Sequence, residues 1–301
     1  WWKTLGKPSL FGINWSSSFS PIPISFIIGI LAFALFTKIE LKRNLRNQPV
    51  LLDLNLLRIT SFRNANIAAA IVSLGEFGLI FSLPLWLQNV LGYSAFGTGL
   101  ILLALAVGSF FASGAGGPLG AKRGPIFVVQ AGIFLELIGV LGIGIVISPT
   151  TKAWVLIIPL FIYGMGVGLA TAQLTGVVLA DVPVEQSGQA SGMASTMRQL
   201  GSALGIAILG TVLFGTLGSG LNGKLEVQSP LPKVAQEQIS RGVVSSAGAL
   251  IPQLKKNAAT AAEGKAAAES FSSSSKWAAG VASLFLLLGL LATRRLKEKA
   301  D

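Results

Sequence analysis

The chain has 301 residues, of which 52% are hydrophobic and only 12% are charged, well below the roughly one quarter charged that is typical of soluble domains. It contains no cysteine and no histidine, which excludes disulfides, thiol chemistry, histidine metal sites and catalysis that needs either residue. The formal net charge is +11, but the basic residues gather beside apolar segments, which favours a membrane over nucleic acid as the partner. No cofactor is expected.

Seven long apolar segments follow one another along the chain. An α-helix rises about 1.5 Å per residue and needs roughly 20 residues to cross a bilayer. Most of the segments meet that length, and the first and last rely on flanking residues. The segments are Pro21–Phe36, Ile67–Leu87, Leu100–Gly116, Ile126–Ile147, Trp154–Gln173, Ala190–Phe214 and Trp277–Ala292. We therefore predict an all-α, polytopic membrane protein with about seven transmembrane helices.

The chain between these segments predicts three regions. Residues 1–20 form an outer N-terminal segment, and residues 21–62 contain the first span and a cytoplasmic interfacial stretch. Within that stretch, Leu51–Ser61 mixes apolar and polar residues as a short amphipathic helix does. Residues 63–301 contain the six remaining spans.

A long connection, residues 217–276, precedes the last span and exceeds an ordinary connector. Its composition is compatible with helix over Val234–Ser246 and Ala258–Glu269. Prolines predict where these pieces break: Pro230, Pro232 and Pro252. A partly ordered spacer without chemistry is the plainer interpretation of this connection.

Lysine and arginine concentrate in three regions that seven crossings put on one side. Cytoplasmic loops are enriched in these residues, so we predict a multi-pass protein of the plasma or inner membrane, with its N-terminus outside and its C-terminus cytoplasmic. The opposite loop Asn89–Gly99 has no basic residue, and the next has Lys152 alone. The basic residues of these three regions are Lys38, Lys42, Arg43, Arg46, Arg58, Arg63, Lys122, Arg123, Arg294, Arg295, Lys297 and Lys299.

The chain opens on Trp1-Trp2-Lys3, without methionine or the pattern of a signal peptide. An outer N-terminus without a signal suggests that further spans precede this sequence. The alternative is a natural seven-helix protein.

Four stretches carry recognisable motifs in a fixed order. They are Phe36…Glu40…Pro49-Val50-Leu51-Leu52-Asp53-Leu54; Leu83-Pro84-Leu85-Trp86-Leu87-Gln88 with Leu91-Gly92-Tyr93-Ser94 and Gly97-Thr98-Gly99; Gly117-Pro118-Leu119-Gly120-Ala121-Lys122-Arg123-Gly124-Pro125; and Val182-Pro183-Val184-Glu185-Gln186-Ser187-Gly188-Gln189-Ala190-Ser191-Gly192, running to Met197-Arg198-Gln199-Leu200-Gly201. Together they resemble the major facilitator superfamily, and most closely its fourteen-spanner drug:proton antiporter branch, the multidrug efflux permeases.

The resemblance covers nearly the whole chain but only the latter half of such a transporter. It implies the second of two linker helices followed by a C-terminal six-helix half, residues 63–301. Superfamily members transport through a cavity between two halves that rock against each other. The resemblance therefore implies four partners: the lipid bilayer, a small-molecule substrate, protons, and an N-terminal half that this sequence lacks.

Glu76 is the sharpest candidate for chemistry, because it falls near the middle of the second apolar segment. A carboxylate there costs several kcal/mol unless it is protonated, paired or facing water. Asn66, Ser73 and Glu76 share one face of the helix. By the resemblance this helix lines the central cavity, so these residues, with Gln173 near the inner end of the fifth span, are the candidates for proton coupling or substrate binding. A structural Glu76, bonded to a neighbouring helix, is the alternative.

Glu136 is equally central in the fourth span and lies on a face with Gly132 and Gly139. The resemblance puts this span at the periphery of the half, so we expect Glu136 to be a structural intramembrane acid. Glycine clusters such as Gly164-Met165-Gly166-Val167-Gly168 do not follow a strand of a βαβ unit, so close helix packing explains them better than phosphate binding.

Gating residues are expected at the cytoplasmic end. Arg198 lies inside the sixth span, with Asp181 and Glu185 in the preceding loop as possible partners. The resemblance gives Arg198 a conformational role near the cytoplasmic gate. It implies a switching role for the Gly-basic loop, although the usual aspartate is absent and a purely topological role is the alternative. The predicted gating residues of that loop are Gly117, Gly120, Lys122, Arg123 and Gly124.

These features predict a secondary transporter that exports amphipathic or cationic drugs in exchange for protons, and not an enzyme or a metal protein. A permease specific for one metabolite is the first alternative. A truncated, non-transporting half that needs a partner half is the second.

Overall fold

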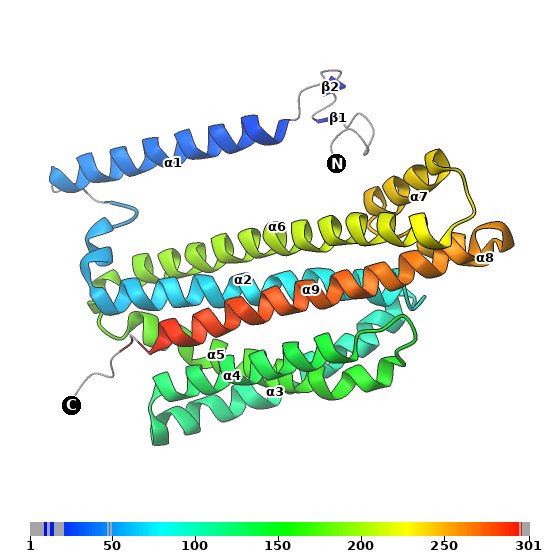
Figure 1. The fold of residues 1–301 in the computed structure, drawn as a ribbon. Helices are drawn as coiled ribbons and strands as arrows, with labels where there is room; N and C mark the ends of the chain where they lie inside the picture. Colours follow the sequence, from blue (N-terminus) through cyan, green and yellow to red (C-terminus); the bar gives the residue numbers. More distant parts are fainter. Residues whose placement is uncertain are drawn as a thin grey trace. The chain divides into compact units, whose positions relative to one another are not determined.

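The computed structural model describes residues 9–10, 13–14, 21–46, 48, 50–294 and 296, with side chains from residue 24 onward in these ranges. Most of the predicted outer segment 1–20, and Arg295, Lys297 and Lys299 of the basic tail, lie outside the described residues. Among the described residues, seven helices are long and apolar enough to cross a membrane. This confirms the prediction of an all-α protein with about seven spans (Figure 1).

The chain divides into two compact units, Trp1–Arg58 and Ile59–Asp301. In the first, β1 (Ser9–Leu10) pairs antiparallel with β2 (Ile13–Asn14), followed by α1 (Pro21–Leu45) and the 3-10 helix η1 (Leu54–Arg58).

A carboxylate closes the turn after α1. Glu40 Oε2 accepts backbone N–H groups of Leu51 and Leu52, at 2.9 and 3.2 Å. Asn44 Nδ2 donates to Asp53 Oδ1 at 3.0 Å. The predicted helix at Leu51–Ser61 is shorter in the structure, because η1 ends at Arg58 and α2 begins at Thr60.

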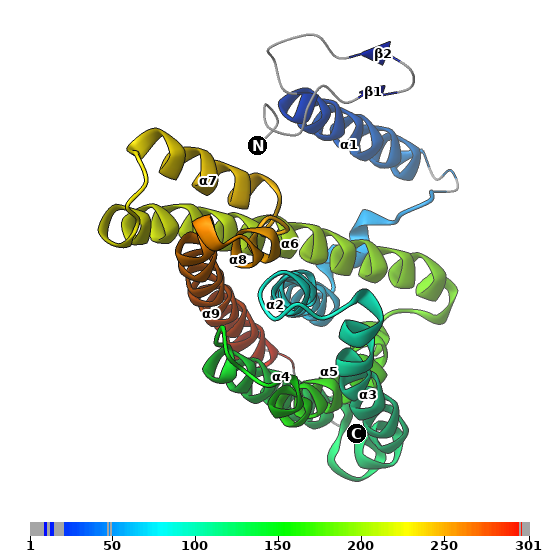
Figure 2. The same ribbon diagram turned by 90° about the vertical axis from the view of Figure 1, so that its right-hand side faces the viewer.

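The second unit holds six of the seven membrane-length helices. In chain order its helices are α2 (Thr60–Asn89), α3 (Ala95–Arg123), α4 (Pro125–Val146), η2 (Ala153–Leu156), α5 (Ile157–Leu179), η3 (Val184–Gln186), α6 (Ser187–Gln228), α7 (Lys233–Ser245), α8 (Ile251–Lys256), η4 (Ala258–Thr260) and α9 (Ala261–Thr293). They form two groups of three, α3 with α4 and α5, and α2 with α6 and α9 (Figures 1 and 2). Helices α4 and α9 join the groups.

Glycines let α2 and α6 approach at backbone distance. A Cβ added at Gly201 would collide with the carbonyl oxygen of Ala70, and one at Gly205 with that of Leu74. The contact points are four residues apart on both helices, from Gly201 to Gly205 on α6 and from Ala70 to Leu74 on α2. The two helices therefore run in the same direction and stay in register. Small residues at such contacts supply the van der Waals packing that holds helices together in lipid.

Helix α5 is packed through glycine on two sides. Gly164 and Gly168 lie against the backbone of α3 at Leu105 and Ser109, and Gly166 lies against Glu136 of α4. The Gly164–Gly168 cluster is therefore a packing element, as the sequence predicted.

The Gly-basic motif is helical and not a loop. The sequence predicted a span that ends at Gly116 and a loop over Gly117–Gly124, but α3 continues through Pro118 to Arg123. Only Gly124 joins α3 to α4, with a φ of +84° that glycine adopts without steric cost. Pro125 then starts α4, where its missing N–H costs nothing. The connection is one residue because glycine and proline meet there.

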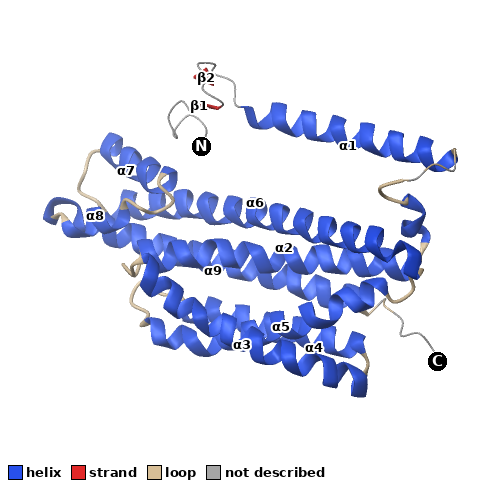
Figure 3. Cartoon of the chain, turned by 180° about the vertical axis from the view of Figure 1, so that it is seen from behind, coloured by secondary structure: helices blue, strands red, loops and turns tan. Residues whose placement is uncertain are grey.

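The segment 217–276 is mostly helical and projects beyond one end of the unit (Figure 3). It contains the end of α6, helices α7 and α8, and the start of α9. We call residues 229–257 the cap, and the end of the unit where it lies the cap end. The helical composition predicted for two pieces of this segment is confirmed.

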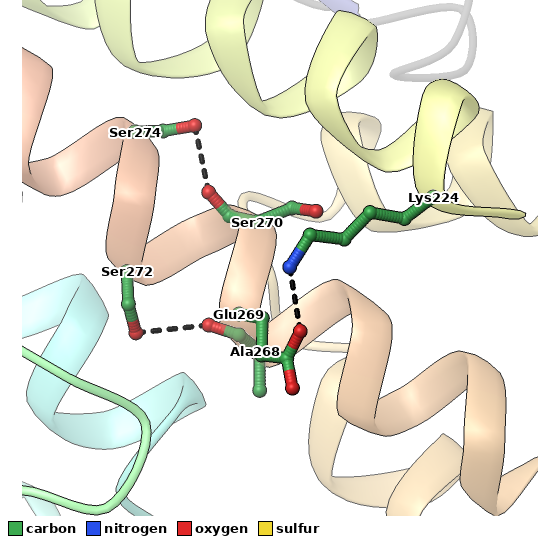
Figure 4. Close-up of polar contacts among 6 residues, drawn as sticks. All are labelled: Lys224, Ala268, Glu269, Ser270, Ser272 and Ser274. Atoms are coloured by element: carbon green, nitrogen blue, oxygen red, sulfur yellow. Dashed lines mark hydrogen bonds and ion pairs between the residues drawn. The ribbon is translucent and has the colours of Figure 1, made fainter. Parts of the chain in front are cut away.

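Hydrogen bonds fasten the cap end to the helices below it. Asn89 Nδ2 donates to the carbonyl of Ala247 at 2.8 Å, and Trp86 Nε1 donates to Ser272 Oγ at 3.0 Å. Lys224 of α6 pairs with Glu269 of α9 at 2.5 Å, next to serines that bond back to their own helix (Figure 4). These contacts join α2, α6 and α9 at one end.

We predict that Gly205→Ala lowers the free energy of unfolding by about 1–3 kcal/mol, because the added methyl collides with the α2 backbone. Gly192→Ala on the same helix is the matched control, since a Cβ there meets nothing within 4 Å. Thermal unfolding of both variants in detergent checks this. Equal unfolding temperatures would contradict the α2–α6 contact.

Candidate functional site

Glu76 lies inside the helical unit and not on an open face. Its side chain is 7% exposed, and Asn66 and Ser73 on the same face of α2 are also buried. Asn66 Nδ2 donates to the carbonyl of Phe62 at 2.8 Å, while its Oδ1 is buried with no partner in the described structure. The polar face predicted on this helix is therefore turned toward the other helices of the unit.

Tyr163 of α5 meets α2 at Glu76. The tyrosine is buried, and its hydroxyl donates to the backbone carbonyl oxygen of Glu76 at 3.2 Å. On its other side Tyr163 packs against Gly139 of α4, where a Cβ would touch the tyrosine backbone at 2.6 Å. Sequence reasoning missed Tyr163. Its signal in the sequence was a polar hydroxyl within an apolar span, at one of only two tyrosines in the chain.

Glu136 belongs to the same neighbourhood. It is 1% exposed, and its Oε2 has no hydrogen-bond partner among the described residues. Electrostatic interactions connect it with Glu76 of α2 and Arg198 of α6. The sequence predicted a structural role for Glu136, and the fold brings it within electrostatic reach of Glu76.

Arg198 is the positive partner of these acids. It interacts electrostatically with both Glu76 and Glu136. The ion pairs among the described residues are Lys224–Glu269 and Arg241–Glu237, so none joins Arg198 to Asp181 or Glu185. Arg198 is half-buried and comes three residues before Gly201, where α6 touches α2.

We call Glu76, Glu136, Tyr163 and Arg198 the carboxyl cluster. They come from α2, α4, α5 and α6. With both carboxyl groups ionised, two negative charges and one guanidinium leave a formal charge of −1, and one proton neutralises the cluster. Charge inside a bilayer costs several kcal/mol, so this arrangement is suited to binding and releasing a proton. Among the described residues, no group of three potential metal-ligating side chains occurs.

Gln173 lies apart from the carboxyl cluster. Its Nε2 donates to the carbonyl of Gly116 on α3 at 2.9 Å, and its amide lies against Gly120, where a Cβ would be 3.0 Å from Nε2. The structure therefore brings a predicted substrate residue to a predicted gating residue. Gly117 has open space around it, with nothing within 4 Å of an added Cβ.

The basic residues of the motif lie at the exposed end of α3. Lys122 and Arg123 are exposed, and the Arg123 guanidinium lies 5.4 Å from the ring centroid of Phe127 on α4. Together with Gly124 they form a tight, positively charged helix connection. Asp181 is also exposed, in the turn between α5 and α6.

Comparison with known proteins agrees with this architecture. The profile of the Major Facilitator Superfamily matches residues 9–206. The chain is 30% identical over 214 residues to the "Multidrug resistance protein Stp" of Mycobacterium tuberculosis, covering 69% of this chain and 39% of that protein. It is 31% identical over 202 residues to a "Probable actinorhodin transporter" of Streptomyces coelicolor, covering 65% and 34%.

A third relative, the "Tetracycline resistance determinant" of Streptomyces rimosus, is 28% identical over 192 residues, or 63% of this chain and 54% of that protein. The chain thus spans about two fifths of the first of these relatives. It belongs to the Major Facilitator Superfamily, a family of membrane transporters and not of enzymes, and it is a multi-pass membrane protein.

We predict that Tyr163→Phe lowers the free energy of unfolding by about 0.5–1.5 kcal/mol, because it removes the hydroxyl that bonds Glu76 O. Tyr93→Phe, at the other and exposed tyrosine, serves as the control and should change stability little. Thermal unfolding of the purified variants measures both. An unchanged unfolding temperature in Tyr163→Phe would show that the hydrogen bond from α5 to α2 does not contribute to stability.

Proposed function

We propose that this chain is part of a secondary transporter that exports amphipathic, cationic small molecules in exchange for protons. The observation that carries the proposal is the carboxyl cluster, in which Glu76, Glu136 and Tyr163 are buried in three helices of a membrane-spanning unit and Arg198 is half-buried on a fourth. The printed names of the relatives, which include multidrug and tetracycline resistance, support this class of substrate.

Glu76 is the coupling residue in this proposal. It is the more exposed of the two acids, at 7% against 1% for Glu136, so it meets water or substrate first when the helices move. Glu136 and Arg198 both interact electrostatically with it. A cationic substrate and a proton compete for the same negative charge, and this competition couples their movements.

A partner half completes the transport path. The least buried spans of the six-helix unit are α3 and α6, with exposed side chains such as Phe110, Phe111, Leu200 and Leu204. An N-terminal half packed on these faces would enclose a cavity between the halves. In this arrangement the cap end faces outside and the Lys122-Arg123 connection faces the cytoplasm, in accord with the positive-inside rule.

Glu76→Gln is expected to abolish substrate-driven proton movement, because glutamine keeps the shape of the side chain and cannot exchange the proton. The measurement is the change in lumenal pH when a cationic dye is added to proteoliposomes that contain the transporter with both halves. Glu237→Gln, at an exposed surface ion pair with Arg241, is the matched control and should couple as the unchanged protein does. Full coupling in Glu76→Gln would refute the role of Glu76.

A panel of neutral metabolites tested in the same vesicles addresses the metabolite-specific alternative. If one metabolite is transported and no cationic compound is, the metabolite-specific permease replaces the drug-export proposal.

The partner half is tested by the mass of the native product. We expect an antibody against the exposed surface of α7 to detect a band well above 31.3 kDa in the source membrane. A band at 31.3 kDa would mean that the half is made alone, and transport would then require a separate partner or a second copy. Co-purification at matched detergent concentration distinguishes those two cases.

A further inference from the structure

A cavity of about 630 Å³ opens at the cap end. Three separate parts of the unit surround it: the α2–α3 connection, the α4–α5 connection and α8 of the cap. Its lining includes two lysines, Lys152 and Lys255, and no aspartate or glutamate. The cavity therefore carries two positive charges from distant points of the sequence without an acid to balance them.

Within the part of the chain that the structure describes, neither lysine has an anionic partner. The ion pairs of the described residues include neither Lys152 nor Lys255. Lys255 Nζ donates to the carbonyl of Val90 at 2.9 Å, which uses one of its three hydrogens. Burial lowers the pKa of the Lys255 ammonium, and no nearby carboxylate opposes that effect. Both lysine residues are exposed, so their free donors are accessible to an anion that enters the cavity.

The lining also contains the donors of Tyr93 and Trp154, while the hydroxyls of Thr150 and Thr151 are hydrogen-bonded to Ser148 and to the carbonyl of Val146. Tyr93, Thr150 and Trp154 line the cavity together with the two lysines. Tyr93 and Trp154 are exposed aromatic residues at the end of the membrane-length helices, the level at which tyrosine and tryptophan meet lipid headgroups. Several donors around two cations match an anion with several oxygens.

Apolar surface leads away from the cavity along the helices. On α5, Ile157 and Ile158 are exposed one turn beyond Trp154, and on α3 Phe96 is exposed one turn beyond Tyr93. A molecule with its charged group between the lysines could lay acyl chains along these residues. The surface thus has the two parts that a phospholipid needs.

We propose that this cavity binds a phosphate-bearing anion, the headgroup of an anionic phospholipid, between Lys152 and Lys255. Lys152 follows α4 in the α3–α4–α5 group, and Lys255 lies on α8, which packs on α9 of the other group. The bound phosphate would bridge the two three-helix groups at one end, so lipid composition would control how firmly they are held together.

The test is binding of short-chain lipids to the purified protein in a neutral detergent. The unfolding temperature is followed against dihexanoyl-phosphatidylglycerol, dihexanoyl-phosphatidylcholine and inorganic phosphate, because a ligand that binds the folded state raises it with concentration. We expect phosphatidylglycerol to stabilise the protein and phosphatidylcholine to have little effect. Equal stabilisation by the two lipids would overturn the proposal.

Lys152→Gln is the cleanest variant, since none of the hydrogen bonds found among the described residues uses this side chain and folding should be preserved. Loss of one charged contact should raise the apparent Kd for phosphatidylglycerol about tenfold or more. Lys255→Gln should act in the same direction. Lys256→Gln is the matched control, because the neighbouring lysine does not line the cavity and should stay within about twofold of the unchanged protein.

Unchanged affinity in the Lys152→Gln, Lys255→Gln double variant would refute the site. Stabilisation by inorganic phosphate that both substitutions abolish, with no further gain from phosphatidylglycerol, would support the anion site and assign it to free phosphate. The readout is binding, so it stands whether or not the transport proposal holds.

Discussion

Close contact between helix backbones, made possible by glycine, is the constraint on which the rest of the structure depends. Gly201 and Gly205 bring α6 onto the α2 backbone, and Gly166 brings α5 onto α4 at Glu136. Lipid gives helices no hydrophobic reason to associate, so van der Waals packing at this distance must hold them. Any side chain at these positions would separate the helices and with them the acidic residues they carry.

The carboxyl cluster follows from that packing. Glu76 and Glu136 come from helices separated by α3, yet they share electrostatic contact with each other and with Arg198. Two buried acids and one half-buried arginine have a formal charge of −1 when both acids are ionised, which one proton can cancel. Tyr163 fixes α5 against α2 at the same level through the Glu76 carbonyl. In the proposed function, the proton-binding residues thus lie where α5 is fixed against α2.

The cap end is organised by polar contacts. Trp86, Asn89 and the Lys224–Glu269 pair join α2, α6, α9 and the cap, while the cavity with Lys152 and Lys255 lies where both helix groups meet. These bonds tie the helices of one group together, and α4 and α9 join the two groups directly. The cavity lies at the end of this junction, and the ion pairs of the described residues do not include its two lysines. A bound anion there would complete the connection in the same way that Arg198 balances the acids within the membrane.

The apolar segments by themselves determined the number of spans and the all-helical class, because crossing a bilayer requires length and hydrophobicity that are local properties. The ordered motifs predicted the family, and Glu76 was conspicuous because a carboxylate in an apolar run is costly. The helix limits at Gly117–Gly124 were wrong, since proline inside a membrane helix is tolerated by neighbouring contacts that sequence does not display. Only the tertiary structure shows that Glu136, Tyr163 and Arg198 interact with α2 at Glu76. It also shows that Gln173 bonds to α3 at Gly116. Sequence could not predict these contacts, because they depend on how each helix is rotated and how deep it lies in the packed unit.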